Sequence, residues 1–297
     1  MATKRKAAKS SKSAKKPKAA AKRSARNAFS VGTNPRRSVK ERVVALAEAP
    51  LTVCESDKDL QAMLKVLANK DEPIKVRLAA LQSLQAASFS VIAFESCRGD
   101  YLATLRKVAE DPDPELRQRV LGLLARENDG FAEKKLLEGL RNPEKALLPP
   151  EKALQLLSYD VHAEAYPIAK EIVSKPPNDD ARREALRLLA ADATAAPLFE
   201  KLLRDKKELR EIRQIAASAL HALKPEKLQE QARKILLDKS DYDDIKATSL
   251  TALEQFGDEE ALGKDKALLK SVGRLSGGKT QAKYKQSARR FLIKHGS

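Results

Sequence analysis

The stretch VRLAALQSL, residues 76–84, decides the fold, because versions of it return along the chain. The later versions are LRQRVLGLL at 116–124, PEKALQLL at 150–157, RREALRLL at 182–189, RQIAASAL at 213–220 and KATSLTAL at 246–253. Their last leucines are 40, 33, 32, 31 and 33 residues apart, at Leu84, Leu124, Leu157, Leu189, Leu220 and Leu253. A period of about 20–50 residues is typical of repeat proteins and predicts a solenoid.

Each repeat contains a second helical pattern before this stretch. Apolar residues at helical spacing mark these first helices, as at Leu60, Met63, Leu64 and Leu67, and again at Leu198, Leu202 and Leu203. Weaker copies of the second helix end at Leu46 and Leu292. Ser38 is a candidate N-cap for a helix over residues 39–49. No interior segment alternates apolar and polar residues for long, so the prediction is an all-α chain without strands.

Composition agrees with helix-on-helix packing. The chain has 297 residues, of which 42% are hydrophobic and 33% charged, while aromatic residues make up 4% and Trp is absent. Nothing approaches the run of about 18 apolar residues that a membrane span needs.

The net charge of +17 is unevenly distributed. Residues 1–40 hold 14 Lys and Arg and no acid, and residues 263–297 hold 10 basic residues and one acid, Asp265. Residues 41–262 therefore carry 58 − 14 − 10 = 34 basic and 41 − 1 = 40 acidic residues, a net of −6. We predict a disordered basic tail and linker over residues 1–38, a repeat solenoid over 39–262, and basic capping helices with a Gly-rich loop over 263–297.

The pattern Asp-x-x-x-x-Val-Arg-x-x-Ala-Leu-x-x-Leu resembles the second-helix signature of HEAT repeats, in the short form found in bacterial and phycobiliprotein-lyase-type arrays. One copy consists of Asp71, Val76, Arg77, Ala80, Leu81 and Leu84, and another of Asp111, Leu116, Arg117, Leu121 and Leu124. The pattern weakens to Ile212 with Arg213 and to Ile245 with Lys246. Residues 142–160 depart most, because the arginine is absent and Pro149 and Pro150 start the helix.

This resemblance implies a right-handed superhelix of helical hairpins whose concave face binds a partner protein. It also implies that the Asp caps the turn and that the Arg reaches across the neighbouring repeat. We therefore expect a non-enzymatic scaffold with no catalytic, cofactor-binding or metal-binding residues and no cofactor. The alternative is a repeat-scaffold enzyme or an enzyme-maturation factor, such as a HEAT-like DNA glycosylase or a lyase-type protein.

The basic tail points to a polyanionic partner. It resembles the lysine-rich tails of linker histones and of some bacterial nucleoid proteins. Lys and Arg neutralise phosphates and release counterions, which gives binding without sequence preference. The candidate contacts are Lys4, Arg5, Lys6, Lys9, Lys12, Lys15, Lys16, Lys18, Lys22, Arg23 and Arg26. A solubility tail, a contact with anionic membranes and a nuclear-import signal remain alternatives.

The tail also bears on location. No apolar signal-peptide core follows the charged N-terminus, so secretion is not expected. The predicted location is the cytoplasm, associated with the nucleoid, if the host is bacterial, and the nucleus if it is eukaryotic.

Arginines on the second helices are candidate contacts on the concave face. They are Arg182, Arg183 and Arg187. Because Glu184 and Glu211 are interleaved with them, ordinary solvated charge is the favoured interpretation.

Three further features receive structural interpretations. Residues 273–280 (GRLSGGKT) match the phosphate-binding P-loop, but a helix end precedes them where that loop needs a buried strand, so a basic loop between helices is predicted. His162, His221 and His295 lack ligand partners at helical spacing and are predicted to lie at the surface or at an interface. Cys54 and Cys97 are predicted to be small buried thiols in a reducing compartment.

Overall fold

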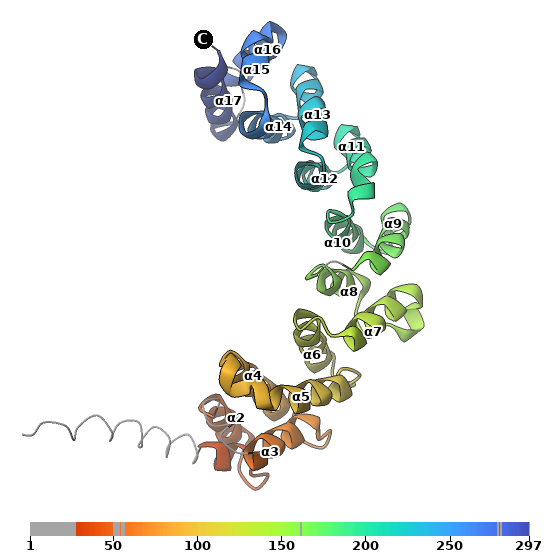
Figure 1. Cartoon of the computed structure of the whole chain (residues 1–297), viewed down its shortest axis with the longest axis vertical. Helices are drawn as coiled ribbons and strands as arrows, with labels where there is room; N and C mark the ends of the chain where they lie inside the picture. Colours follow the sequence, from red (N-terminus) through yellow and green to blue (C-terminus); the bar gives the residue numbers. More distant parts are fainter. Residues whose placement is uncertain are drawn as a thin grey trace, which may run out of the picture. The chain divides into compact units, whose positions relative to one another are not determined.

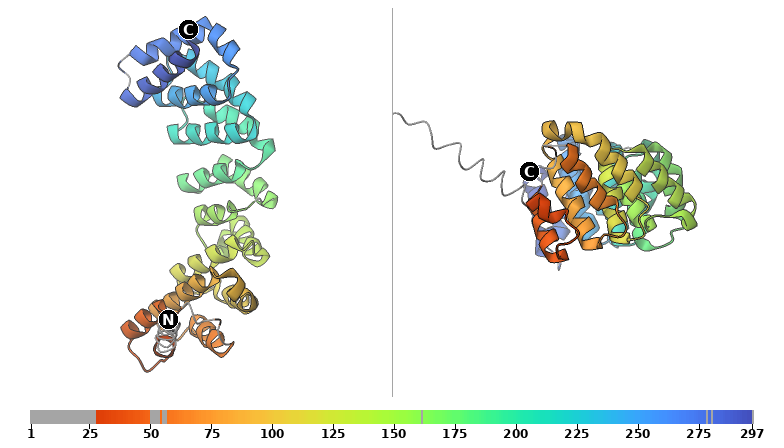
Figure 2. Two further views of the ribbon diagram at one scale, coloured as in Figure 1. Left: turned by 60° about the vertical axis from the view of Figure 1, so that its left-hand side comes forward. Right: turned by 90° about the horizontal axis from the view of Figure 1, so that it is seen from below.

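The computed structural model describes residues 28–49, 54, 57–160, 162–277, 279 and 281–296, and every regular element in this part of the chain is a helix (Figure 1). The predicted all-α fold is confirmed. The helices cluster into two compact units that divide between Ala132 and Glu133. Within each unit, successive helices pair as hairpins that stack on their neighbours, which Figure 2 shows from two other sides. This is the packing of an α-solenoid.

The first unit begins earlier in the sequence than predicted. Residues 28–32 form a short helix in which Ala28 and Phe29 are buried, although the sequence predicts a linker there. The predicted tail residues up to residue 27 lie outside the described part of the chain. The helices that follow are α2 (Val39–Ala47), α3 (Asp57–Ala68), α4 (Ile74–Ser88), α5 (Val91–Val108) and α6 (Pro114–Arg126).

The second unit holds the more regular repeats. Its helices pair as α9 with α10, α11 with α12, α13 with α14, and α16 with α17. The α-helices are α7 (Gly130–Arg141, whose first residues precede the division), α8 (Pro150–Leu157), α9 (Tyr166–Ser174), α10 (Asp179–Leu189), α11 (Ala196–Arg204), α12 (Arg210–Leu223), α13 (Pro225–Leu237), α14 (Asp243–Phe256), α15 (Glu259–Lys264), α16 (Lys266–Gly277) and α17 (Ala282–His295). Short 3₁₀ turns lie at Pro143–Lys145, Ala163–Ala165 and Ala193–Ala195.

The repeated leucines form the core of the stacks. All six that end the second-helix stretches are exposed by 3% or less. In the last weak copy the fully buried residue is Phe291, and Leu292 is only partly buried. In α11 the fully buried residue is Phe199, beside a half-buried Leu198. The period is therefore correct, and the register shifts by one residue at these two places.

Helix starts follow local rules. Ser38 accepts the N–H of Glu41 at 3.3 Å, and the Glu41 carboxylate accepts the N–H of Ser38 at 3.0 Å, so the predicted cap is a complete capping box. The Ser38 hydroxyl also donates to this carboxylate at 2.7 Å, and this bond together with that from the Ser38 N–H lowers the pKa of Glu41. Asp113 and Asn178 cap α6 and α10 in the same manner.

Three buried arginines make the same contact in different repeats. In each, the Nε–H donates to the backbone carbonyl ten residues earlier, near the end of the first helix of the same hairpin. The pairs are Arg42 with Gly32 at 3.1 Å, Arg77 with Leu67 at 2.9 Å, and Arg213 with Leu203 at 2.8 Å. The contact satisfies a carbonyl that a helix end would otherwise leave without a donor.

The guanidinium groups of the same arginines reach the next hairpin. Arg42 binds Glu72 at 2.6 and 2.9 Å, Arg77 binds Asp111 at 2.5 Å, and Arg213 binds both oxygens of Asp241 at 2.7 Å. Burial would raise the pKa of Asp111, but hydrogen bonds from Arg77 and the backbone outweigh it and lower that pKa. Each arginine thus ties two helices of its own hairpin to the following repeat.

The Asp of the repeat pattern does not cap the second helix in either copy. Asp71 does not cap α4, whose N-cap is Pro73 and has no side-chain hydrogen bond. The neighbouring Glu72 carboxylate accepts the hydrogen bond from Arg42. In the next repeat the Asp111 carboxylate accepts the hydrogen bond from Arg77, and Asp113 caps α6. One carboxylate at each turn therefore serves the arginine, and capping falls to a different residue.

The two cysteines lie together in the first unit. The structure joins Cys54, ahead of α3, to Cys97 on α5 in a disulfide with a Cα–Cα distance of 6.3 Å. The prediction of two separate buried thiols is therefore wrong. The two cysteines are 43 positions apart in sequence, with all of α3 and α4 between them, and α3 packs directly on α5, which brings the two positions together.

Candidate functional site

The predicted concave-face arginines lie on α10 and engage neighbouring carboxylates. Arg182 makes a two-pronged contact with Glu208 at 2.9 and 2.6 Å, and its side chain is only 21% exposed. Arg183 and Arg187 pair with Asp180 and Glu184 within the helix, and both also lie within 4.0 Å of Glu211 on α12, at 3.5 and 3.7 Å. Hydrogen bonding to Glu208 raises the pKa of Arg182, and hydrogen bonding to Asp180 raises that of Arg183. A polyanion at this surface would have to compete with carboxylates that already hold the arginines.

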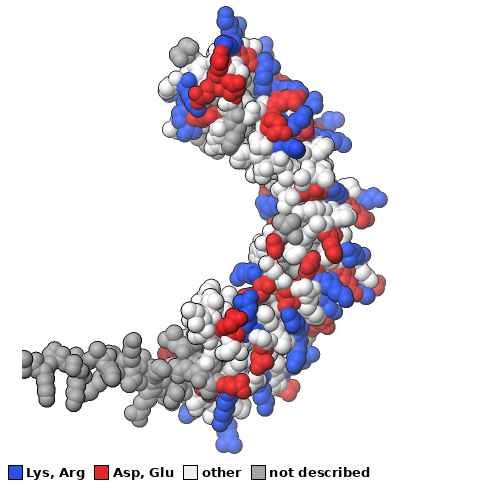
Figure 3. All heavy atoms as spheres, in the orientation of Figure 1, with Lys and Arg blue, Asp and Glu red and all other residues white. Residues whose placement is uncertain are grey.

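An apolar patch projects from the first unit at the turn between α4 and α5. Phe89, Val91 and Ile92 are exposed by 79, 64 and 95%. Phe89 ends α4, and α5 begins at Val91 without a side-chain cap from Ser90. The helices therefore meet at a tight corner that turns three large apolar side chains to solvent, and Figure 3 shows an uncharged projection beside the end of α4. We call Phe89, Val91 and Ile92 the corner patch.

A small recess lies next to the corner patch. Val91 shares its lining with Phe94 and Tyr101, whose rings meet edge to face at 5.2 Å. Tyr101 is 3% exposed, and its hydroxyl has no hydrogen-bond partner among the described residues. Burial, and to a smaller degree the charge of Glu127, raises the pKa of Tyr101. The recess therefore has an apolar wall, and the Tyr101 hydroxyl is buried behind it without an acceptor among the described residues.

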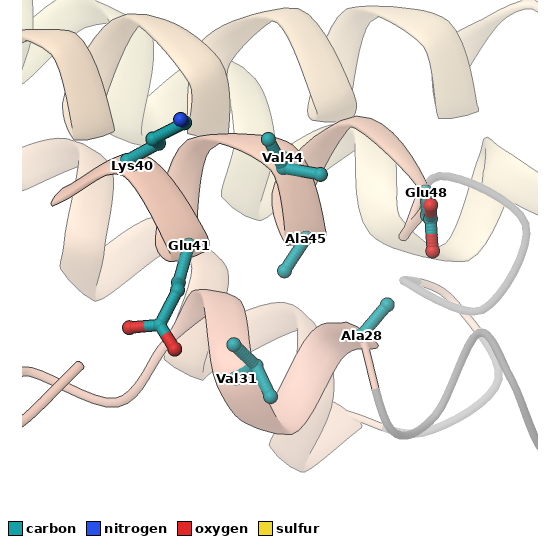
Figure 4. Close-up of a pocket in the computed structure, with 7 residues that line it drawn as sticks. All are labelled: Ala28, Val31, Lys40, Glu41, Val44, Ala45 and Glu48. Carbon is teal, nitrogen blue, oxygen red and sulfur yellow. The ribbon is translucent and has the colours of Figure 1, made fainter. Parts of the chain in front are cut away.

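The N-terminal hairpin carries a second apolar surface. A groove of about 420 Å³ lies between the helix at residues 28–32 and α2. Figure 4 shows Ala28 and Val31 facing Val44 and Ala45 across it, with Glu41 and Glu48 at its sides. Val44 is 57% exposed because no described helix covers this side of the first hairpin.

The P-loop match does not have P-loop geometry. Lys266–Gly277 is one continuous helix, so Gly273 to Gly277 form its last turns and no strand precedes them. The predicted loop is therefore helical over most of its length. Lys279 is exposed and lines a polar recess with Arg210, Tyr242 and Tyr284, where the Arg210 guanidinium stacks on the Tyr242 ring at 4.0 Å.

Substitution of Lys279 is expected to have little effect. Lys279→Ala should leave the free energy of unfolding within about 0.5 kcal/mol of the wild type, because the side chain is exposed. It should also leave any binding of ATP unchanged. Urea unfolding and calorimetric titration with ATP check this expectation, and saturable ATP binding that disappears in the variant would contradict it.

The three histidines differ in their surroundings. His162 lies 3.1 Å from Glu133. His295 is only 4% exposed and packs on Phe291 with ring centroids 4.7 Å apart, so of the two predicted positions, surface or interface, it does not occupy the surface. The last turn of α17 is buried against the α13–α16 core cluster that contains Phe291, which explains the difference. Among the described residues, no three His, Cys, Asp or Glu side chains gather as metal ligands.

Comparison with known proteins does not assign the chain to a family. No model of a known protein family matches the chain, and neither does any curated protein sequence. In the part of the chain that the structure describes, no helix has the length and apolar character to cross a membrane.

Proposed function

We propose that the chain is a non-enzymatic scaffold of HEAT-like repeats, which binds a partner protein through the folded body and nucleic acid through its basic N-terminal segment. The corner patch is the observation that carries the first half of this proposal. Folded soluble proteins leave single apolar side chains exposed, whereas three adjacent large ones are typical of interaction sites. Ile92 alone is 95% exposed.

The recess beside the corner patch indicates the chemistry of the partner. An apolar side chain of the partner would cover Phe89 and Ile92, which are 79 and 95% exposed, whereas the Tyr101 hydroxyl is buried beneath the recess. Arg98 and Glu127 form an ion pair at the rim. An apolar centre within a polar rim is the usual anatomy of a protein interface. The proposed occupant is a protein segment that presents an apolar side chain flanked by polar groups, which would meet Arg98 and Glu127 at the rim.

The second half of the proposal rests on charge. The eleven Lys and Arg between Lys4 and Arg26 are accompanied by no Asp or Glu. Such a segment neutralises phosphates wherever they are dense, independently of base sequence. Together the two activities would hold a partner protein next to nucleic acid. The proposed location is the nucleoid in a bacterial host or the nucleus in a eukaryotic one.

The corner patch is tested by a charge placed at its centre. Ile92→Glu should lower recovery of the partner in affinity purification by about tenfold or more, because an unpaired charge in an apolar interface removes its central contact. Ile293→Glu is the matched control, since Ile293 is an equally large side chain, 81% exposed on α17. The measurement is quantitative mass spectrometry of proteins recovered with the wild type and both variants.

Two outcomes would contradict this use of the corner patch. Equal recovery of every partner by both variants would show that the patch binds none of them. If sedimentation shows that the wild type self-associates and that Ile92→Glu is monomeric, the occupant is a second copy of this chain and not a separate partner.

A further inference from the structure

Several cations near the end of the second unit have a carboxylate partner. Lys206 pairs with Asp238, and Arg233 pairs with Asp265 at 2.6 Å. Arg210 lies 3.8 Å from Asp244. Hydrogen bonds from Lys206, and then from Ser240, lower the pKa of Asp238 to about 2. The acids in and beside the turn between α13 and α14 are thus largely committed to other cations.

One group of cations lies apart from these pairs. A cavity of about 290 Å³ opens between the end of α13, the start of α14 and one face of α16. Lys239, Lys246 and Arg274 line it, and none of the three has a carboxylate partner among the described residues. The remaining lining residues are Leu236, Asp243, Ser271 and Leu275. We call this site the basic cavity.

Hydrogen bonds join the segments that line the basic cavity, and its lining carries a net positive charge. Lys246 is half-buried, and its ammonium donates to the Lys239 carbonyl at 3.4 Å. The Ser271 hydroxyl donates to the Leu236 carbonyl and fixes α16 against α13. Three cations face one carboxylate, that of Asp243, so the lining carries an excess of two positive charges.

The positive charge continues along α16. Lys266 and Lys270 precede Arg274 at steps of four residues, which places the three on one side of the helix about 6 Å apart. Both lysines are exposed and, like Arg274, have no carboxylate partner among the described residues. In Figure 3 blue side chains lie along the outer edge of α16. A row of cations thus leads into the basic cavity.

We propose that the basic cavity and the row on α16 form a phosphate-binding site for the backbone of nucleic acid. Lys and Arg supply most protein contacts to backbone phosphates. The Arg274 fork can bind two oxygens of one phosphate, while Lys239 and Lys246 act as point charges on either side. Leu236 and Leu275 provide an apolar floor that lowers the effective dielectric around these contacts.

Charge density favours a nucleic acid over an acidic protein segment. A duplex carries about one negative charge per 1.7 Å of its axis, so it can meet the cavity and the row together. The single carboxylate of Asp243 would repel a phosphate from the α14 side and direct it toward Lys239 and Arg274. This inference rests on the proposed nucleic-acid function and adds a site in the folded body that acts with the N-terminal segment.

The test removes the charges of the basic cavity from the full-length chain. One variant carries Lys239→Gln, Lys246→Gln and Arg274→Gln. The matched control carries Lys227→Gln, Lys234→Gln and Lys264→Gln, which removes the same charge from exposed lysines paired with Glu230 or Glu260. Each protein is titrated against a random duplex of about 30 base pairs at about 50 and 200 mM salt.

The cavity variant should bind the duplex at least about tenfold more weakly than the control at low salt. The slope of log affinity against log salt should become shallower by about 2.7, or 0.9 for each of three contacts. Equal losses of affinity in the cavity variant and the control would overturn the site, because net charge alone would then explain both. A cavity variant that binds as tightly as the wild type would overturn it as well, and the N-terminal segment would remain the proposed contact.

Lysine footprinting of the unmodified protein gives a second readout. Bound duplex should protect Lys239, Lys246 and Lys270 from acetylation and leave Lys227 and Lys234 reactive. Reactive cavity lysines in the complex would overturn the proposal even if the variants failed to fold. If polyglutamate protects them and duplex does not, the ligand is an acidic protein segment, and the nucleic-acid assignment fails at this site while the tail's function stays open.

Discussion

Arg213→Met is expected to lower the free energy of unfolding of the second unit by about 3–5 kcal/mol. Arg213 is 0% exposed and Asp241 is 3% exposed, so removal of the guanidinium leaves a carboxylate buried without its counter-charge. The Leu203 carbonyl at the end of α11 also loses its side-chain donor. Urea unfolding followed by circular dichroism measures the loss. Hydrogen exchange should localise the weakened protection to α11, α12 and the start of α14.

Two controls separate the buried pair from charge in general. Arg187→Met removes a half-exposed arginine that pairs with Glu184 on α10 and with the exposed Glu211 on α12, and should cost about 0.5 kcal/mol or less. The double variant Arg213→Met with Asp241→Leu should recover part of the stability, because it removes both charges and fills the space with apolar groups. A single variant as stable as Arg187→Met would show that the arginine contacts do not hold the repeats together.

The fold could be predicted from the sequence because it depends on a period. Leu84, Leu157 and Leu220 recur at nearly equal intervals, and each is almost completely buried. A solenoid contact joins residues about one repeat apart, so a regular interval in sequence becomes a regular contact in space. The prediction shifts by one residue at Phe291 and Phe199. There a larger side chain occupies the core position, and size outweighs the leucine pattern.

The candidate sites could not be predicted in the same way, because they depend on which side of a helix remains uncovered. Phe89 and Ile92 look like core residues in sequence, and only the corner between α4 and α5 leaves them exposed. Lys239, Lys246 and Arg274 come from three different segments and meet through the packing of α13, α14 and α16. Nothing in the sequence separates them from Lys206 or Arg233, whose charges are paired.

The structure also sets where the basic tail can be removed cleanly. The sequence predicts that the tail and linker end at residue 38, but residues 28–32 form a helix that packs against α2. The Gly32 carbonyl at the end of this helix accepts the Nε–H of Arg42. A deletion to residue 37 would therefore remove a structural contact together with the charges. Deletion of residues 1–27 removes all eleven candidate Lys and Arg and keeps the first hairpin.

Deletion of residues 1–27 is expected to produce the largest change in nucleic-acid binding. If about six of the eleven cations contact phosphates, the tail contributes a slope of about −5 in log affinity against log salt. Full-length protein should then lose about 10³-fold in affinity for random duplex between about 50 and 200 mM salt. The deleted protein should bind weakly at both concentrations, with the shallow slope of the few contacts that remain in the folded body. Fluorescence anisotropy measures both slopes.

The order of residues in the tail provides the sharper control. Counterion release depends on the number of phosphates neutralised, so a tail with its residues shuffled should restore the affinity, and a tail with every Lys and Arg changed to Gln should not. If the shuffled tail does not restore the affinity, a partner recognises a specific motif within residues 1–27.

If the deleted protein binds duplex as tightly as the whole chain at both salt concentrations, recognition belongs to the folded body. The basic cavity at Lys239, Lys246 and Arg274 then becomes the main contact, and binding to anionic vesicles would reassign the tail to a membrane surface.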